Sequence, residues 1–247
     1  MIMPTIDNSW WRHFRTVGGV SIIHVDLSPE KECEGEALAW LDEQEQVRRQ
    51  RFVHAGPRRR FSLCRAALRA VLCEALNCKN EQLSFQTSRY GKPFALVQDM
   101  PASASFNVGH SGNHGLVAYA PTGRLGVDIE ERDAQRDLSL LIDTVLGPEE
   151  RTALALTQGL ARTRLFFKLW ILKEAVLKAL GEGFALDATC IRIPAAMLGG
   201  KKSGMLRLPR LPAVTWRIED LGNQEFAAAV AYELDTASAK KDEHPDA

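Results

Sequence analysis

The sequence lacks several features that would each indicate a particular class of protein. No apolar run reaches the roughly 20 residues that a membrane-spanning helix needs. The opening residues, MIMPTIDNSWWRHF, do not place an apolar run after a basic start, so we expect no secretory signal. The five cysteines show no metal-binding spacing, and we expect most of them to be buried, reduced thiols. These absences predict a cytoplasmic protein that does not act at a membrane.

A net charge is also missing, because 31 basic residues balance 31 acidic residues. Overall electrostatics therefore give no reason to expect nucleic acid as a partner. The charges are nevertheless distributed unevenly. Between Gln46 and Cys73 there is no acidic residue, and eight arginines stand at positions 48, 49, 51, 58, 59, 60, 65 and 69. Such a block suits phosphate groups or an acidic protein surface; the alternative is the solvated side of a helix, which we expect for about half of these arginines.

A weak internal repeat organises the chain. At an offset of 104 residues, SIIHVDL (21–27) lies over LGVDIEE (125–131), and RFSLCRAALRAVLCEAL (60–76) lies over RLFFKLWILKEAVLKAL (164–180). Each copy reads as a strand, a long helix and about three short strands. With 247 residues, 45% of them hydrophobic, the chain is long enough for two such halves with their own cores.

We therefore predict an α+β protein with an N-terminal half at 1–121, a C-terminal half at 122–235 and a polar tail at 236–247. Two like halves packed together leave a cleft between them, which is a common place for a site. The repeat aligns His24 with Asp128 and Asp26 with Glu130, although few identities support the alignment.

The stretch LGVDIEERD (125–133) places two acidic residues on one face of a predicted strand. Its apolar residues alternate with Asp128 and Glu130, so the two carboxylates lie roughly 7 Å apart along the same face. One interpretation is the solvated face of an edge strand. The other is a bound cation, which would compensate the repulsion between the two carboxylates.

The stretch RTRLFFKLWILKEAVLKALGEGF (162–184) predicts a helix that ends at Gly181 or Gly183. Leucines at 165, 169 and 172 and the valine at 176 form one apolar stripe. The opposite side carries further large apolar residues, which predicts a helix that is buried on two sides.

Two charged residues lie on that second side. Glu174 and Lys178 are spaced i, i+4, so they can form an ordinary ion pair on a helix surface. Their neighbours Phe167 and Trp170 favour a different interpretation, in which the pair lies in a partly dry cleft. Charged groups in such places tend to be functional.

Asp128, Glu130 and Glu174 are thus three candidate ligands for one cation. Oxygen ligands without histidine or cysteine favour Mg²⁺, with Mn²⁺ also possible. Because Mg²⁺ commonly completes its shell with substrate phosphates, these acids predict a phosphorylated substrate. Lys92 in YGKPF and His110 in FNVGHSG are candidate phosphate binders, although a Gly-Lys-Pro turn and a lone histidine are common structural features.

The order of these motifs resembles a known family. YGKPF (90–94), FNVGHSG (106–112), GVDIE (126–130) and FFKLWILKEAVLKALGEGF (166–184) are similar to the motifs of the 4′-phosphopantetheinyl transferases of the surfactin-synthetase-activating type, and the similarity runs over about 37–235. The resemblance implies two similar α+β subdomains in a pseudo-twofold arrangement, with the active site at their interface.

The resemblance also implies a reaction. A serine hydroxyl of an acyl, polyketide or peptidyl carrier protein attacks the pantetheine-side phosphorus of coenzyme A, and 3′,5′-ADP is released. By carry-over, Asp128, Glu130 and Glu174 hold Mg²⁺, Glu174 is the candidate base, Glu150 matches a further acid of some members, and Lys178 neutralises charge that develops on the phosphate.

The same carry-over assigns the coenzyme A site. His110 and Lys92 would hold phosphates, while Arg48, Arg60 and the backbone of 87–92 would surround the nucleotide end. The resemblance implies carrier protein and coenzyme A as partners, and the size and two-half architecture lead us to expect a monomer.

One residue departs from the family pattern. The family has Ser directly before the histidine of this motif, and this chain has Gly109. A glycine N–H or Ser111 could contact the phosphate instead, because glycine lets a ligand approach the backbone closely. Two other classes of function stay open at this point: a Mg²⁺-dependent hydrolase of nucleotide pyrophosphates, and a module that binds coenzyme A or carrier protein without chemistry.

Overall fold

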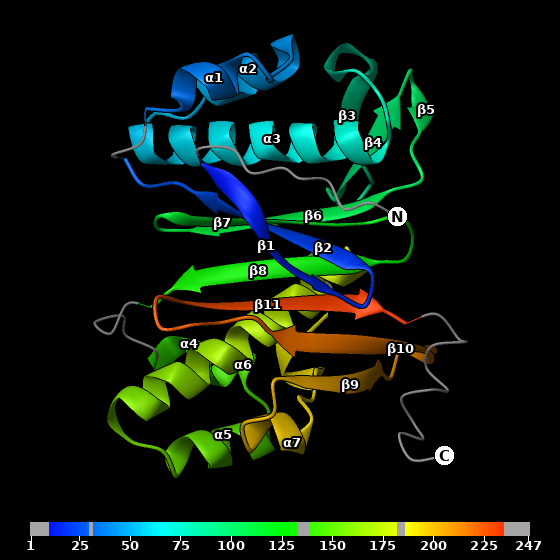
Figure 1. Cartoon of the computed structure of the whole chain (residues 1–247). Coiled ribbons are helices and arrows are strands. Elements are labelled where there is room, and N and C mark those ends of the chain that lie inside the picture. Colours follow the sequence, from blue (N-terminus) through cyan, green and yellow to red (C-terminus); the bar gives the residue numbers. More distant parts are fainter. Residues whose placement is uncertain (1–9, 30–31, 133–138, 182–185, 235–247) are drawn as a thin grey trace. The chain divides into compact units, whose positions relative to one another are not determined.

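The computed structural model of the chain describes residues 10–29, 32–132, 139–181 and 186–234 (Figure 1). The chain divides into two compact units, Met1–Thr122 and Gly123–Ala247, called unit 1 and unit 2 below. The division lies one residue beyond the boundary predicted from the sequence. Both units combine helices with antiparallel sheet, so the predicted α+β class is confirmed. The predicted tail at 236–247 and Gly183 lie outside the described residues.

Unit 1 is built on a four-stranded antiparallel sheet in the order β1-β2-β7-β6. Its strands are β1 (Trp11–Val17), β2 (Val20–Asp26), β6 (Ser105–Ser111) and β7 (His114–Ala120). The long helix α3 (Ala55–Ala75) covers one face of this sheet, and α1 (Glu34–Leu38) and α2 (Glu43–Gln50) lie on the far side of α3 (Figure 1). A short 3₁₀ helix (Asn80–Gln82) leads into a small second sheet of β3 (Leu83–Thr87), β4 (Pro93–Val97) and β5 (Met100–Pro101).

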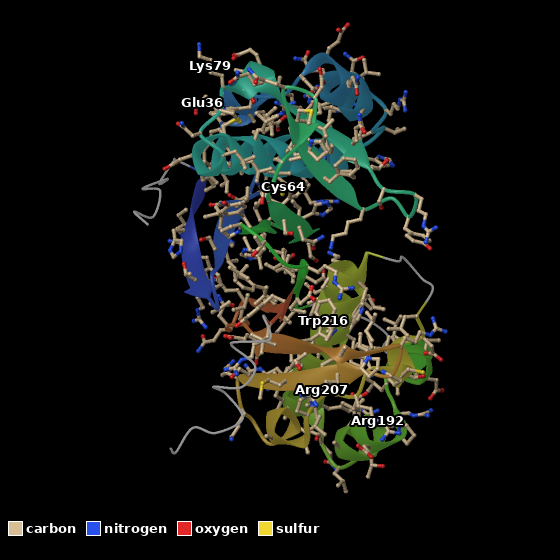
Figure 2. The ribbon with its side chains drawn as sticks, turned by 90° about the vertical axis from the view of Figure 1, so that its right-hand side faces the viewer. Glu36, Cys64, Lys79, Arg192, Arg207 and Trp216 are labelled. Carbon is tan, nitrogen blue, oxygen red and sulfur yellow. The ribbon has the colours of Figure 1, made fainter. Side chains whose placement is uncertain are left out.

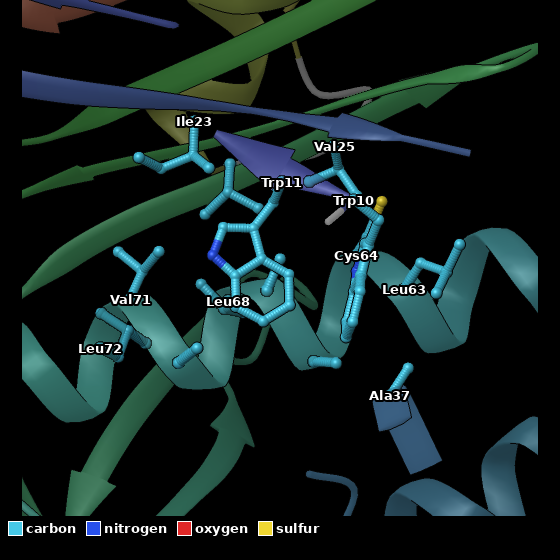
Figure 3. Packing of buried hydrophobic residues seen from close by; sticks show 14 of the residues in the cluster. Trp10, Trp11, Ile23, Val25, Ala37, Leu63, Cys64, Leu68, Val71 and Leu72 are labelled. Atoms are coloured by element: carbon cyan, nitrogen blue, oxygen red, sulfur yellow. The ribbon is translucent and has the colours of Figure 1, made fainter. Parts of the chain in front are cut away.

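The core of unit 1 lies between α3 and the four-stranded sheet (Figure 3). Trp10 and Trp11 meet edge to face with their ring centroids 4.3 Å apart. In the same cluster, Leu68 of α3 and Val25 of β2 are almost fully buried. Burial of such large apolar side chains is the main contribution that fixes α3 on the sheet.

Unit 2 has one four-stranded antiparallel sheet in the order β8-β11-β10-β9. Its strands are β8 (Leu125–Glu131), β9 (Ser203–Leu208), β10 (Leu211–Asp220) and β11 (Phe226–Glu233). Its helices are α4 (Ser139–Val145), α5 (Pro148–Ala155), α6 (Gly159–Leu180) and α7 (Ala195–Leu198), with a 3₁₀ helix at Ala188–Cys190. No helix in the described part of the chain has the length and apolarity that a membrane crossing requires.

Helix α6 confirms the prediction from periodicity. It ends at Gly181, which adopts the left-handed conformation (φ 68°) typical of helix C-terminal glycines. Most of the predicted apolar stripe and of the second apolar side is buried, with Leu169, Leu172 and Phe167 at most 1% exposed, while Leu165 and Trp170 are partly buried. The helix therefore packs against neighbours on two sides, as the sequence predicted.

The two units share a topology, but the repeat gave the wrong strand register. In each unit the first strand of the repeat pairs antiparallel with the last strand, β2 with β7 and β8 with β11. In unit 1, Ile23 and Val25 belong to the core cluster that faces α3, so His24 between them lies on the other face. In unit 2, Asp128 contacts α6. The alignment of His24 with Asp128 is therefore wrong by one residue, and a one-residue slip reverses the faces.

Candidate active site

Strand β8 and helix α6 approach each other unusually closely at Gly126. A Cβ atom at this position would lie 2.2 Å from the carbonyl oxygen of Ala175 and 2.3 Å from the backbone nitrogen of Ala179. Only glycine permits this contact between a strand and the backbone of a helix. Because side chains alternate along a strand, Asp128 and Glu130 share the face of Gly126 and point towards α6.

The structure argues against one of the two interpretations of the paired acids, the solvated face. Strand β8 is an edge strand of its sheet, but the Asp128 residue is only 9% exposed, so a solvated face does not describe it. Its Oδ1 accepts a hydrogen bond from the ammonium group of Lys178 at 2.6 Å. The lysine thus pairs across the interface between strand and helix, rather than along the helix with Glu174 as its i, i+4 spacing had indicated.

Glu174 lies in the same group of charges. Burial raises the pKa of its carboxyl above the usual value, and the nearby charge of Asp128 raises this pKa further. The ammonium of Lys178 and a hydrogen bond from the Trp170 side chain lower it, and Glu130 adds a smaller rise. Each of these effects requires proximity, so the three predicted carboxylates and the predicted lysine converge between β8 and α6.

The carboxylates fit the chemistry of a hard divalent cation. They offer only oxygen ligands, and their mutual repulsion, which raises the Glu174 pKa, is what a positive ion would relieve. No set of three His, Cys, Asp or Glu side chains within the described ranges is already arranged to hold a metal ion. Lys178 occupies one oxygen of Asp128, so metal binding would have to share or displace that contact.

The structure does not bring Glu150 to this group. One oxygen of its buried carboxylate accepts the N–H of Gly147 at 2.8 Å, and the other accepts the N–H of Ile193 at 3.1 Å. The ammonium of Lys173, which is fully buried, lies 2.5 Å from Glu150 and also donates to two backbone carbonyls. Glu150 thus ties the start of α5 to α6, which is a structural task the sequence did not indicate.

In unit 1, two of the predicted coenzyme A residues, Arg48 and His110, line the same pocket, which has a volume of about 190 Å³. Arg48 comes from α2 and His110 from the end of β6. Arg65 of α3 adds a third basic wall, and the rest of the lining is mostly apolar: Phe61, Leu68 and Val108. The guanidinium carbon of Arg48 lies 5.3 Å from the ring centroid of Phe61, which holds the arginine over the pocket wall.

The other predicted coenzyme A residues, Arg60, Lys92, Gly109 and Ser111, are not among the residues that line this pocket. Arg60 is close enough to Cys64 to lower the thiol pKa by its charge. Lys92 follows a turn in which Ser88 accepts the N–H of Gly91 (φ 83°). Gly109 precedes His110 in β6, so it faces the opposite side of the sheet from His110, and Ser111 shares that opposite side.

Most arginines of the block between Gln46 and Cys73 are bonded within unit 1. Five of its members form hydrogen bonds or ion pairs inside unit 1: 49, 58, 59, 65 and 69. Arg69 is completely buried and bonded to Asp42, Glu45, Asn80 and the carbonyl of Leu83. Neither phosphate binding nor a solvated helix side accounts for such arginines. The acids that pair with these arginines precede the acid-free block in the sequence.

Comparison with known proteins agrees with this arrangement. Residues 124–231 match the sequence profile of the 4′-phosphopantetheinyl transferase superfamily, and residues 27–122 match that of the 4′-phosphopantetheinyl transferase N-terminal domain. The two matches correspond to unit 2 and unit 1. The chain belongs to the 4′-phosphopantetheinyl transferase superfamily, in the form with two domains.

Individual relatives carry the same family name. The 4′-phosphopantetheinyl transferase HetI of Nostoc is 33% identical over 157 residues, which are 64% of this chain and 66% of HetI. The 4′-phosphopantetheinyl transferase Sfp of Bacillus subtilis is 26% identical over 174 residues, which are 69% of this chain and 75% of Sfp. A Synechocystis relative is 37% identical over 147 residues, and the match spans 60% of this chain and 59% of that protein. The chain thus spans less than two thirds of the length of some of these relatives.

Proposed function

We propose that this protein transfers the 4′-phosphopantetheine group of coenzyme A to a serine of a carrier protein of fatty acid, polyketide or peptide synthesis. The serine oxygen forms a bond to the pantetheine-side phosphorus, the bond from that phosphorus to the bridging oxygen breaks, and 3′,5′-ADP leaves. Family membership supports this reaction, and the observation that carries it is the convergence of Asp128, Glu130, Glu174 and Lys178 between β8 and α6.

The acids of β8 and α6 fit the requirements of this chemistry. We propose that Asp128, Glu130 and Glu174 hold Mg²⁺, with Mn²⁺ as a possible substitute. When bound, the ion would neutralise the pyrophosphate of coenzyme A. Phosphoryl transfer asks the protein mainly for positioning and charge stabilisation, and a rigid contact between a strand and a helix meets that demand.

Glu174 is the proposed base for the serine proton, directly or through a water molecule. The hydrogen bond from Trp170 fixes the orientation of its carboxylate, which is a condition for efficient proton transfer. Lys178 is the proposed cation that stabilises negative charge on the phosphate in the transition state. Glu150 has both oxygens engaged with backbone N–H groups, so we assign it to the support of α5 and α6.

The nucleotide end of coenzyme A would contact unit 1. The pocket of Arg48 and His110 offers basic groups at its wall, Arg60 lies on α3, and Lys92 directly precedes β4 in the same unit. An acidic carrier surface would complement basic residues such as these, which makes association sensitive to salt.

The test is the mass of a purified apo carrier protein after incubation with this protein, coenzyme A and Mg²⁺. We expect the carrier to gain one phosphopantetheine group and 3′,5′-ADP to appear in equal amount. The variant Asp128→Asn should lose this activity, while Asp143→Asn, which changes an exposed aspartate of α4, should retain it. Free phosphopantetheine with an unmodified carrier would support a hydrolase instead. Binding of coenzyme A without any product would support a module without chemistry.

A further inference from the structure

The end of helix α3 carries two cysteines that have no part in the proposed active site. Cys73 lies in the last turn of α3, and Cys78 lies two residues beyond the C-terminal cap, Leu76. Asn77, directly before Cys78, adopts a left-handed conformation (φ 49°). The N–H of Asn77 donates to the carbonyl of Glu74 at 3.2 Å, and the N–H of Cys78 donates to the carbonyl of Cys73 at 2.9 Å. These two hydrogen bonds define a Schellman motif, in which the side chains at the positions of the two cysteines commonly touch.

The two thiol groups are in direct contact. A hydrogen bond joins the side chains of Cys73 and Cys78. Two cysteines can form a disulfide without movement of the backbone only if their Cα atoms lie within about 7 Å, and the hydrogen bond between the two backbones keeps them within this limit. The pair therefore has the geometry that a disulfide requires, while both thiols are free in the structure.

Two adjacent thiols can also serve as metal ligands, but the surroundings of this pair do not favour a metal ion. A structural zinc site needs four ligands. Among the described residues, no further His, Cys, Asp or Glu side chain joins the two cysteines to form a metal-binding group of three. The pair is therefore suited to reversible oxidation rather than to metal binding.

The environments of the two thiols give them different roles in thiol–disulfide exchange. Cys78 is partly exposed and Cys73 is buried, so Cys78 reacts first with an oxidant. Burial, together with the charge of Cys78 and the hydrogen bond to it, raises the pKa of the Cys73 thiol to about 12, and the charge of Arg69 opposes this rise. A Cys78 sulfur in a mixed disulfide carries no charge, so its contribution to the raised pKa disappears, and Cys73 is then more easily deprotonated.

The segment that follows the pair supports a buried ion-pair network. Oδ1 of Asn80 accepts a hydrogen bond from Nη1 of the completely buried Arg69 at 2.8 Å. Nδ2 of Asn80 donates to the carbonyl of Trp40 at 2.9 Å. A covalent link between Cys73 and Cys78 would tether this segment to α3, and it would restrict the unfolded chain at the same point.

We propose that Cys73 and Cys78 form a reversible disulfide that holds the end of α3, with a small disulfide such as oxidised glutathione as the oxidant. The Cys78 thiolate first forms a bond to one sulfur of oxidised glutathione, whose S–S bond breaks and releases one glutathione thiolate. Cys73 then loses its proton to water, its sulfur forms a bond to the Cys78 sulfur, and the second glutathione leaves as a thiolate. Two cysteine thiols are thereby oxidised to one disulfide, and oxidised glutathione is reduced to two glutathione molecules. The proposal rests on unit 1 alone and does not depend on the transferase reaction.

The experiment equilibrates the full chain with oxidised glutathione, stops the exchange with acid and maps the tryptic peptides by mass spectrometry. Cys73 and Cys78 lie together in the peptide 70–79, and Cys190 lies alone in the peptide 179–192. We expect the peptide 70–79 to lose two hydrogens and to carry no glutathione, while glutathione on the exposed Cys190 shows that the oxidant has reacted. Oxidation should also raise the midpoint of urea denaturation by about 0.5–1 M, and dithiothreitol should reverse this shift.

Two variants control for other effects of the oxidant. Cys78→Ser removes the more accessible thiol of the pair, so its peptide 70–79 should lose no hydrogens and its urea midpoint should not respond to the oxidant. Cys190→Ser, which removes an exposed thiol of unit 2, should behave as the wild type does at the peptide 70–79.

The wild-type peptide map decides the proposal even if Cys78→Ser does not fold. Two free thiols in the peptide 70–79, beside a Cys190 that carries glutathione, would overturn the proposal. Glutathione that stays on Cys78 would overturn it as well, because Cys73 would then not resolve the mixed disulfide. A disulfide that leaves the urea midpoint unchanged would refute the claim that it holds the end of α3.

Discussion

The close contact at Gly126 predicts a large effect from the smallest possible side chain. In Gly126→Ala the new Cβ would lie 2.2 Å from the Ala175 carbonyl oxygen, which is 1.2 Å short of the 3.4 Å at which ordinary contact begins. The opposing atoms are helix backbone and cannot rotate away, so α6 or β8 must move. Overpacking of a core costs about 1–3 kcal/mol, and we expect this substitution to lie near the upper end, at about 3 kcal/mol.

The same displacement should affect activity. A shift of about 1 Å in catalytic groups can reduce a rate by roughly 10²-fold, and α6 carries Glu174 and Lys178, while β8 carries Asp128. We therefore expect Gly126→Ala to lose both stability and carrier modification. The matched control is Gly35→Ala in α1, where a Cβ would meet nothing within 4 Å; alanine there should leave stability unchanged or raise it by up to about 1 kcal/mol.

The assay is urea denaturation of both variants, followed by circular dichroism, together with the rate of carrier modification. A Gly126→Ala variant with the stability and rate of the wild type would show that β8 and α6 do not approach as described. A Gly35→Ala variant that is equally destabilised would show that the effect is not specific to the contact between strand and helix.

Two further substitutions and one labelling experiment test separate parts of the structure. Glu150→Gln should leave the buried Lys173 without its counter-charge and cost about 3–5 kcal/mol in the free energy of unfolding; a stable variant that loses only kcat would restore Glu150 to the chemistry. Gly109→Ser should change the Kd of coenzyme A by less than about twofold, because position 109 faces away from the pocket of His110, and calorimetry showing a tenfold change would contradict this. Burial raises the pKa of Cys64 to about 12, so at pH 8 only roughly 10⁻⁴ of this thiol is reactive thiolate. In native protein, iodoacetamide should therefore label the exposed Cys190 first. Equally rapid labelling of Cys64, seen by mass spectrometry, would contradict its burial between α3 and β7 (Figure 2).

Periodicity in the sequence predicted the elements that carry the acids. The alternation in 125–131 gave β8, with Asp128 and Glu130 on one face. The stripe of leucines and the glycine at 181 gave α6 and its end. These signals are local, because they depend on side chains a few residues apart. The weak repeat also indicated that the two halves are similar. The structure agrees, because both units pair their first and last repeat strands.

Other features depended on contacts between distant residues, which a local pattern does not contain. The sequence placed both acids on one face but could not say that this face lies against α6. The i, i+4 spacing allowed Lys178 to pair with Glu174 on its own helix, but its ammonium lies 2.6 Å from Asp128 of β8. Lys173 gave almost no signal of its burial, since one lysine on a helix normally points to water. The only sequence hint was its position among apolar residues.

The arginines show the same limit. A run of basic residues without acids indicated an exposed surface, yet Arg69 is buried and pairs with Asp42 and Glu45, which precede the run. Charge composition thus predicts that basic groups are present, and only the packing shows which of them are bonded within the protein.

The most direct test of the proposed active site is the kcat of Glu174→Gln for carrier modification across a Mg²⁺ titration, with coenzyme A binding measured separately. Glutamine keeps the size and one ligating oxygen but cannot accept the proton. If Glu174 is both ligand and base, kcat should fall by about 10²–10⁴-fold, saturating Mg²⁺ should not restore it, and coenzyme A should still bind. Near-normal kcat at ordinary Mg²⁺ would contradict the assignment of the active site to β8 and α6, and full recovery at high Mg²⁺ would reduce Glu174 to a metal ligand and move the base to a water molecule.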